Sequence, residues 1–180
     1  MEHFYKNTEG ENWFTYPGLY SEIVNKFPSG SHFIEVGVWK GRSACYMAVE
    51  IINSEKQIKF DCVDAFEWIE QKDISKEKFS NLYETYLKNI EPVSHIINTV
   101  KKLSLEAVHD YADNSIDFIF IDASHDYENV KADIDAWLPK VKTGGIIAGH
   151  DLHADGVKQA VKESFNNNYV IKDGCWVYLK

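Results

Sequence analysis

Short apolar runs alternate along the chain with longer amphipathic stretches. Five runs are rich in β-branched and aromatic residues and are bounded by Gly, Asp or Asn, which predicts strands buried on both faces. We place these strands at residues 32–36, 58–63, 95–97, 116–121 and 145–149. Helical patterns fill the intervals, at residues 41–53, about 75–90, 103–111, 127–138 and 154–165. Strands that alternate with helices of about ten or more residues connect through right-handed crossovers, so we expect a parallel sheet.

The two ends of the chain depart from this alternation. Residues 1–28 are rich in aromatic side chains, and we expect them to form a helical lid or flank. Near the other end, an Asp-Gly dipeptide at 173–174 separates two apolar runs, residues 168–172 and 175–179, which is a strong hairpin signal. The pattern predicts one α/β domain over residues 1–180. Its doubly wound, mostly parallel sheet has seven strands, and a C-terminal antiparallel hairpin closes one edge.

Composition places the chain among globular proteins and limits its partners. Of the 180 residues, 44% are hydrophobic and 26% are charged, and the formal net charge is -9. Nonspecific binding to nucleic acid or to an anionic membrane needs clustered Lys and Arg, so we expect neither partner. An acidic protein of this kind is expected to bind a neutral or cationic small molecule.

Targeting signals and cysteine usage favour a cytoplasmic protein. No run approaches the roughly 20 apolar residues needed to cross a bilayer, and the first residues lack the hydrophobic core of a secretory signal. The three cysteines, Cys45, Cys62 and Cys175, lie in predicted helices or strands and show no C-x-x-C spacing. We therefore expect free thiols in a reducing cytoplasm, without a disulfide or a zinc site.

The segment that joins the first predicted strand to the next helix carries the most specific pattern. Glu35 ends the strand, Gly37 and Gly41 follow, and Ser43 opens the helix. The glycines let the backbone turn tightly and approach a ligand, and Ser43 with the helix N–H groups can hold a carboxylate. The spacing is not the dinucleotide fingerprint G-x-G-x-x-G, and Glu35 would repel a pyrophosphate, which disfavours NAD. A ligand with a carboxylate, an amine and ribose hydroxyls but no phosphate fits better. S-adenosylmethionine (SAM) is such a ligand.

A second acid, Asp64, ends the next predicted strand. It follows Glu35 by about one strand–helix–strand unit of roughly 30 residues, so the two strands are expected to be neighbours. Asp64 can then bind both hydroxyls of a ribose, with Ala65 and Phe66 beside it in the cofactor site. A carboxylate that caps the following helix is the alternative interpretation of Asp64.

Polar side chains also follow the fourth and fifth predicted strands. Asp122 comes directly after one, and His150 and Asp151 after the other. The carboxyl ends of parallel strands meet at one edge of a sheet, so we predict that these three side chains form a divalent-metal site beside the cofactor, with Asp122 contacting both. Carboxylates suit Mg²⁺ or Mn²⁺. For His150, the alternative is a packed residue bonded to the backbone.

The pattern E-x-G-x-x-x-G-x-S, the acid ending the next strand and the strand–helix alternation resemble class I SAM-dependent methyltransferases, which have a Rossmann-like fold. From about residue 12 to the end, the chain is similar to the metal-dependent O-methyltransferase branch, which includes catechol and macrocin O-methyltransferases. The resemblance implies that Glu35 and Asp64 contact the amine or ribose side of SAM, and that Ser43 contacts its carboxylate. It also implies that the loop after the third strand, with Ser104, lies against the adenine.

The same resemblance implies a mechanism. A metal binds two substrate oxygens and lowers the pKa of the one to be methylated. The base lies three residues after the acid of strand four, a spacing that Asp122 and His125 share, so His125 is the expected general base. A histidine that caps the next helix is the alternative. The chain departs from its relatives at residues 101–104, where an acidic Gly-Asp-Ser is frequent, and at His150-Asp151, where two oxygen ligands are frequent.

We therefore expect a methyltransferase that moves the methyl group of SAM to a hydroxyl of a small molecule, such as a sugar, phenol or natural product, with help from a divalent metal. A metal-independent N-methyltransferase and a SAM- or nucleoside-binding module without transfer activity are the alternatives. The aromatic residues before position 28 would cover SAM and exclude water, or simply pack against the sheet. The oligomeric state stays open, with a homodimer as one expectation.

Overall fold

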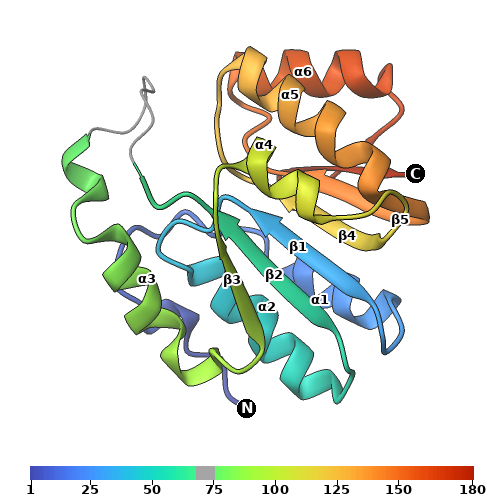
Figure 1. Ribbon diagram of the computed structural model, residues 1–180. Coiled ribbons are helices and arrows are strands. Elements are labelled where there is room, and N and C mark those ends of the chain that lie inside the picture. Colours follow the sequence, from blue (N-terminus) through green and yellow to red (C-terminus); the bar gives the residue numbers. More distant parts are fainter. Residues whose placement is uncertain (68–75) are drawn as a thin grey trace.

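The computed structural model describes residues 1–67 and 76–180 (Figure 1). Within these residues, seven strands form one sheet in the order β3-β2-β1-β4-β5-β7-β6. The strands are β1 (His32–Val36), β2 (Lys59–Asp64), β3 (Ile97–Lys101), β4 (Ile116–Ile121), β5 (Val141–Gly149), β6 (Val170–Lys172) and β7 (Cys175–Leu179). The first five pair in parallel, and β7 runs antiparallel to both β5 and β6. The predicted doubly wound sheet with its closing hairpin is confirmed.

Helices cover both faces of the sheet. On one face lie α1 (Pro17–Lys26), α2 (Arg42–Ser54) and α3 (Leu82–Ile90), and on the other lie α4 (Ser104–Ala107), α5 (Tyr127–Trp137) and α6 (Asp155–Phe165) (Figure 1). Each layer has its own apolar core, because each face of a parallel sheet must be shielded from water. No helix of the described residues is long and apolar enough to span a membrane.

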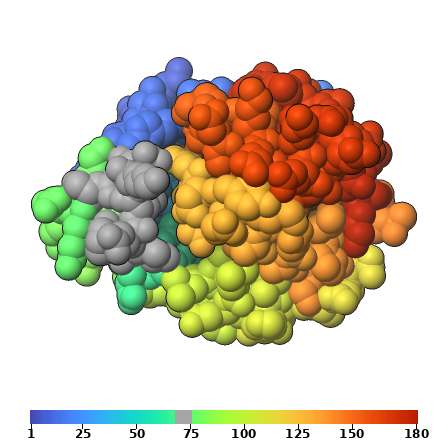
Figure 2. All heavy atoms as spheres, turned by 90° about the horizontal axis from the view of Figure 1, so that it is seen from above, coloured from blue at the N-terminus to red at the C-terminus, as the bar shows by residue number. Residues whose placement is uncertain are grey.

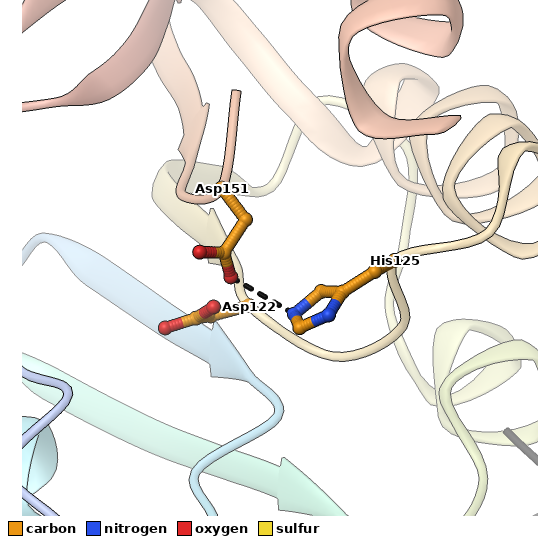
Figure 3. A group of neighbouring side chains, drawn as sticks. All are labelled: Asp122, His125 and Asp151. Carbon is orange, nitrogen blue, oxygen red and sulfur yellow. Dashed lines mark ion pairs between the residues drawn. The ribbon is translucent and has the colours of Figure 1, made fainter. Parts of the chain in front are cut away.

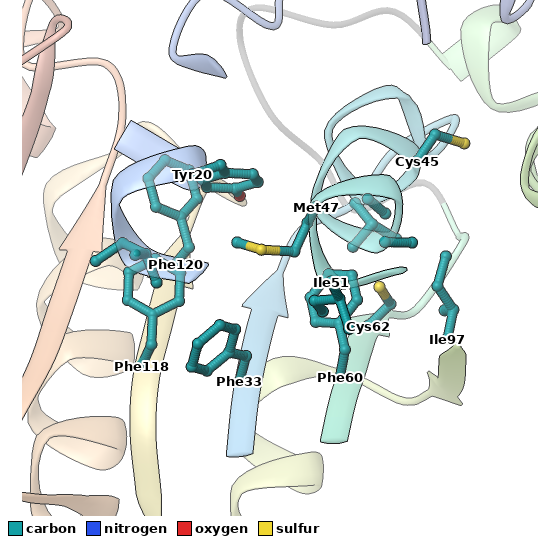
Figure 4. Close-up of a cluster of buried hydrophobic side chains, with 14 of the residues drawn as sticks. Tyr20, Phe33, Cys45, Met47, Ile51, Phe60, Cys62, Ile97, Phe118 and Phe120 are labelled. Carbon is teal, nitrogen blue, oxygen red and sulfur yellow. The ribbon is translucent and has the colours of Figure 1, made fainter. Parts of the chain in front are cut away.

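Alternation along the central strands feeds the two cores. In β4, Phe118 and Phe120 point toward α1 and α2, whereas Ile119 and Ile121 point toward α5 and α6. Figure 4 shows the first of these cores, with Met47 of α2 among the aromatic rings of the sheet and of α1. The cysteines are buried and form no disulfide, as expected from the sequence.

The third strand and two helices differ from the sequence-based prediction. The pattern places the third strand at residues 95–97, but a 3₁₀ helix, η3 (Glu91–Val93), and the turn after it delay pairing until Ile97. β3 is an edge strand with exposed Asn98 and Lys101, so it lacks the continuous apolar run of a central strand.

The helix predicted at 103–111 is only α4, followed by the 3₁₀ helix η4 (Val108–Asp110). The helix predicted at about 75–90 is α3, preceded by the 3₁₀ helix η2 (Lys76–Phe79), because Asn81 adopts a left-handed conformation that interrupts the spiral. Position 75 lies outside the described residues. Residues 1–28 were predicted to form a helical lid or flank. The helices in this segment are η1 (Tyr5–Asn7) and α1, and residues 8–16 between them are not helical.

The strand order changes direction at β1, which lies between β2 and β4. Crossovers on either side of this point leave by opposite faces of the sheet, so a crevice opens at the carboxyl ends of β1 and β4. Gly37 stands at that point with φ at +84°, and a Cβ there would lie 2.3 Å from the Asp122 carbonyl oxygen. Only glycine fits both the conformation and the contact.

We expect Gly37→Ala to destabilise the fold by roughly 3 kcal/mol or more, because it adds a backbone clash to the strain of a positive φ. Gly144→Ala is the matched control, since Gly144 has φ at +81° and open space around the position of a Cβ. That variant should lose only about 1 kcal/mol. Urea denaturation of both variants checks the difference, and equal losses would contradict the steric argument.

Candidate functional site

A cavity of about 760 Å³ opens at the carboxyl ends of the parallel strands. Its walls come from residues 9–16, the β1–α2 loop, the end of β2, residues 102–105, and the ends of β4 and β5. The predicted site residues that line it are Gly37, Ser43, Asp64, Ala65, Ser104, Asp122, His125, His150 and Asp151. Three others, Glu35, Gly41 and Phe66, are not among the lining residues. Its volume falls in the range of about 300–1,000 Å³ that small-molecule sites occupy.

Asp64 holds the loop that forms the cavity floor. Its Oδ2 accepts hydrogen bonds from the backbone N–H groups of Val38 and Trp39, each at 3.0 Å, and its Oδ1 accepts one from Phe66 N–H at 2.7 Å. Burial raises the pKa of this carboxyl, although the three N–H donors act in the opposite direction. Asp64 therefore fixes the shape of the loop and keeps lone pairs available to a ligand in the cavity.

Glu35 lies beneath the floor. Along β1 it shares a face with Phe33, toward α1 and α2, so its side chain is directed away from the α5–α6 layer. Its Oε1 accepts a hydrogen bond from the Ser43 hydroxyl, and its Oε2 is buried near the Tyr20 hydroxyl, whose interaction favours the ionised form of Glu35. Burial raises the pKa of Glu35 to about 8, so the side chain holds a proton at neutral pH.

Gly41 and Phe66 have packing roles in this structure. Gly41 has φ at +80°, and a Cβ there would come within 2.9 Å of the Tyr86 ring. Phe66 packs its ring against Tyr83 and Tyr86, with centroid distances of 4.8 and 4.6 Å. Both residues thus join the loops under the cavity to α3.

Two carboxylates and two histidines gather where β4 and β5 end. One donor atom from each of Asp122, His125 and Asp151 lies within 4.8 Å of the others, and Figure 3 shows these three side chains converging. The Nε2 atom of His125 is 2.9 Å from Asp151 Oδ2. The Nδ1 atom of His150 is 3.0 Å from Asp151 Oδ1 and 4.0 Å from Asp122 Oδ1. The set of side chains that could hold a metal ion is thus Asp122, His125 and Asp151, which includes the predicted base. The predicted ligand His150 lies beside this set and contacts Asp151.

Electrostatics within this cluster are uneven. Loss of hydration, reinforced by the charge of Asp151, raises the pKa of Asp122 to about 6. Burial alone would raise the pKa of Asp151, but hydrogen bonds with His125 and His150 outweigh it and hold that pKa well below its usual value. Burial alone would lower the pKa of His150, yet its hydrogen bond to Asp151 and the charge of Asp122 raise it.

The N-terminal segment reaches this cluster. The Tyr16 hydroxyl donates a hydrogen bond to Asp122 Oδ2 at 2.8 Å, and Thr15 Oγ1 lies 3.2 Å from His150 Nε2. Nearer the start of the same segment, the Arg42 guanidinium donates hydrogen bonds to the carbonyl oxygens of Thr8 and Gly10. Figure 2 shows the N-terminal residues, in blue, next to the orange and red C-terminal part of the chain.

Sequence reasoning missed Trp39, Phe79 and a buried acid in the cavity, where the two rings form an aromatic wall with Trp13. The rings of Trp13 and Trp39 face each other with centroids 5.6 Å apart, and Phe79 meets Trp39 edge-on at 5.0 Å. Asp133 of α5 lines the cavity as well. Aromatic richness before residue 28 was the only signal for the wall, and no local pattern distinguishes Asp133 from other helical acids.

Comparison with known proteins agrees with the site. The fold and the cavity define a class I SAM-dependent methyltransferase domain: a switch-point crevice with a glycine turn and an acid at the end of the second strand. The family described as a methyltransferase domain matches residues 34–152, and the chain belongs to that family. The predicted class of enzyme is confirmed.

One curated relative, the uncharacterized protein y4gI of Sinorhizobium fredii, is 34% identical in an alignment of 80 residues, and the match covers 39% of this chain and 9% of that protein. The match therefore spans a small part of that relative's length. Among solved structures, the O-methyltransferase NovP superimposes with a TM-score of 0.70 at 16% identity, covering 91% of this chain and 78% of that one.

Two further solved structures share the fold. CalS11, described as a TDP-rhamnose 3'-O-methyltransferase of calicheamicin biosynthesis, gives a TM-score of 0.62 at 16% identity, covering 91% of this chain and 77% of that one. A SAM-dependent O-methyltransferase from Thermotoga maritima gives a TM-score of 0.59 at 17% identity, covering 89% of this chain and 53% of that one.

Glu35 predicts a pH dependence of stability. The native side chain keeps its proton up to a pKa of about 8, whereas the unfolded chain releases it near 4.5, so folding stability should fall as pH rises between these values. The free energy of unfolding would fall by up to about 1.4 kcal/mol per pH unit in this range. Glu35→Gln should remove this component, and its stability relative to the wild type should rise with pH. Chemical denaturation from pH 5 to 8 measures it.

Glu106→Gln serves as the control, because Glu106 is exposed. It should keep the wild-type slope. A Glu35→Gln protein with an unchanged slope would contradict the burial of a protonated acid at this position.

Proposed function

We propose that this protein transfers the methyl group of SAM to a hydroxyl of a small molecule, with a divalent cation at the cavity floor. The observation that carries the proposal is the convergence of Asp122, His125 and Asp151 inside the large cavity of a methyltransferase fold. The printed descriptions of NovP and CalS11 as O-methyltransferases support oxygen as the acceptor atom.

SAM fits the cavity residues through complementary groups. The first-turn N–H groups of α2 have no intrahelical partners and suit its carboxylate, and the free lone pairs of Asp64 suit its ribose hydroxyls. The sulfonium methyl group is already activated when SAM is bound. The chain's task is then to hold the acceptor oxygen in line with that methyl group and to remove its proton.

Asp122, Asp151 and His150 suit a cation such as Mn²⁺ or Mg²⁺. The carboxylates offer hard oxygen ligands, and His150 Nδ1 faces both of them while its Nε2 contacts Thr15. A bound cation would supply Lewis acidity to two acceptor oxygens. The residues present therefore fit the cation that the resemblance implies.

His125 is the proposed general base. Its Nε2 lies against Asp151 Oδ2, and a carboxylate partner orients an imidazole and stabilises its protonated form. An imidazole has an ordinary pKa of about 6.5, which suits removal of a hydroxyl proton near neutral pH. His125 lies on the loop between β4 and α5, where it can face an acceptor in the cavity.

The aromatic wall is the proposed acceptor end of the cavity. Trp13, Trp39 and Phe79 present apolar rings at the side formed by the N-terminal segment. Rings of this kind pack well against the flat face of a sugar or a phenol. Such an acceptor falls within the neutral or cationic small molecules expected from the acidic composition.

Two histidine variants separate base from ligand. We expect His125→Ala to lower kcat by about 10²–10⁴-fold while Mn²⁺ still binds, because the base is lost and the ligands remain. His150→Ala should weaken Mn²⁺ binding, measured by calorimetry, and lose activity with it. A chelator should abolish turnover of the wild type, and added Mn²⁺ should restore it.

His109→Ala, at an exposed site, is the control and should match the wild type in both assays. Full activity in the presence of chelator would refute the metal-assisted version and favour transfer without a metal. Loss of Mn²⁺ binding in His125→Ala would make His125 a ligand.

Removal of the aromatic wall tests the acceptor end. Trp13→Ala should raise the acceptor KM about tenfold and leave SAM affinity unchanged, because the indole is 46% exposed and lines the cavity against Trp39. Leu87→Ala, which removes a side chain 42% exposed on α3 and away from the cavity, is the control. Equal KM values in the three proteins would overturn the assignment.

A further inference from the structure

Residues 13–16 bring a short stretch of the N-terminal segment to the cavity. All four line it, and α1 begins directly after them at Pro17. Trp13 is 46% exposed at the aromatic wall, whereas Tyr16 is only 1% exposed. Four consecutive residues span at most about 14 Å, so this stretch joins the proposed acceptor end to the proposed cation site over a short length of chain.

The Tyr16 hydroxyl holds one oxygen of Asp122. It donates a hydrogen bond to Asp122 Oδ2 at 2.8 Å. The tyrosine ring packs against Phe120 of β4 and against Phe14, with centroid distances of 4.6 and 4.8 Å. The second oxygen, Asp122 Oδ1, lies on the side of His150, 4.0 Å from its Nδ1. Because the ring is buried between two others, its hydroxyl fixes the rotation of the Asp122 carboxylate.

Thr15 makes a matching contact with His150. Thr15 Oγ1 lies 3.2 Å from His150 Nε2, and Nδ1 of the same ring lies 3.0 Å from Asp151 Oδ1. The Tyr16 ring also packs on this imidazole, with a centroid distance of 5.0 Å. A hydrogen bond to one ring nitrogen sets the orientation of an imidazole and decides which nitrogen is available to a cation. Thr15 therefore directs Nδ1 of His150 toward the carboxylates.

We propose that Thr15 and Tyr16 are positioning residues of the cation site, and that a bound cation in turn holds residues 13–16 closed over the cavity. The inference rests on the proposed function, because it assumes a divalent cation beside Asp122 and Asp151. Thr15 and Tyr16 act through the ligands that they hold, and neither is itself a proposed ligand.

The second part of the proposal follows from the first, because coupling between two equilibria is mutual. The contacts of residues 13–16 hold Asp122 and His150 in the orientation that a cation requires. A bound cation must then stabilise the same contacts by the same factor. Outer partners of this kind typically change metal affinity by about 10–100-fold. An effect of that size is large enough to measure from both sides.

Cation affinity tests the positioning role. We expect Mn²⁺, titrated by calorimetry into the chain alone, to bind about tenfold more weakly to Thr15→Val and to Tyr16→Phe than to the wild type. Each substitution keeps the shape of the side chain and removes one hydroxyl. Thr15→Ser, which restores the hydroxyl, should bind as the wild type does.

Matched controls come from residues away from the cavity. Thr143→Val, at an exposed position of β5, and Tyr178→Phe, beside Phe165, should keep the wild-type affinity. Unchanged Mn²⁺ affinity in both Thr15→Val and Tyr16→Phe would overturn the inference. A wild-type chain that binds no Mn²⁺ would instead refute the cation of the proposed function.

Proteolysis tests the closing of the segment. Chymotrypsin can cut after Trp13 or Phe14 only when this stretch leaves the cavity, so the initial rate of cleavage, followed by mass spectrometry, reports the open fraction. Saturating Mn²⁺ should slow this cleavage about tenfold in the wild type. It should have little effect in a chain that carries both Thr15→Val and Tyr16→Phe. Equal slowing in the two proteins, or none in the wild type, would contradict the coupling.

A purely structural role for Tyr16 would give a different result. Tyr16→Phe would then lower the melting temperature and keep the wild-type Mn²⁺ affinity, which counts against the proposal. If Tyr16→Phe does not fold, Thr15→Val decides, because Thr15 is exposed and its substitution leaves the core intact. A weaker Mn²⁺ affinity in that variant supports the inference, and an unchanged one refutes it.

Discussion

The whole site depends on how closely the β1–α2 loop approaches the end of β4. Gly37 N–H donates to the Val63 carbonyl and Asp122 N–H to the Val36 carbonyl, each at 2.8 Å, so the ends of three strands are joined around one glycine. Asp64 then fixes the rest of the loop through the N–H groups of Val38 and Trp39. Because a Cβ at Gly37 has no room, this contact sets the position of every group on the cavity floor.

The N-terminal segment couples the two halves of the cavity. Arg42 of α2 ties it down at Thr8 and Gly10, and Tyr16 contacts Asp122 at its other end. Trp13 of the aromatic wall lies between these anchors, so the proposed acceptor end and the proposed catalytic cluster share one covering segment. Sequence reasoning left open whether the aromatics form a lid or a packed flank. In the structure Tyr16 and Tyr20 are buried, whereas Trp13 stands at the cavity.

The sequence predicted the fold well because its signals are local. The alternation of short apolar runs with amphipathic stretches predicted the central strands, and the bounds of β1 and β4 match that prediction. The Asp-Gly dipeptide predicted the hairpin. It placed most of the cavity residues because the carboxyl ends of parallel strands must meet. It could not show that Glu35 lies under the floor, since that depends on which face the strand turns to α1. Asp133 was missed because its contact with Ser104 joins two helices, and no spacing rule reports such a contact.

The charges of the acid cluster support the cation of the proposed function. Burial and the charge of Asp151 together raise the pKa of Asp122, whereas hydrogen bonds with His125 and His150 lower the pKa of Asp151. The histidines offset the two acids only in part, because His125 and His150 both contact Asp151, whereas Asp122 relies on Tyr16 and on His150 at 4.0 Å. In the proposed function, a divalent charge beside both carboxylates would let Asp122 ionise.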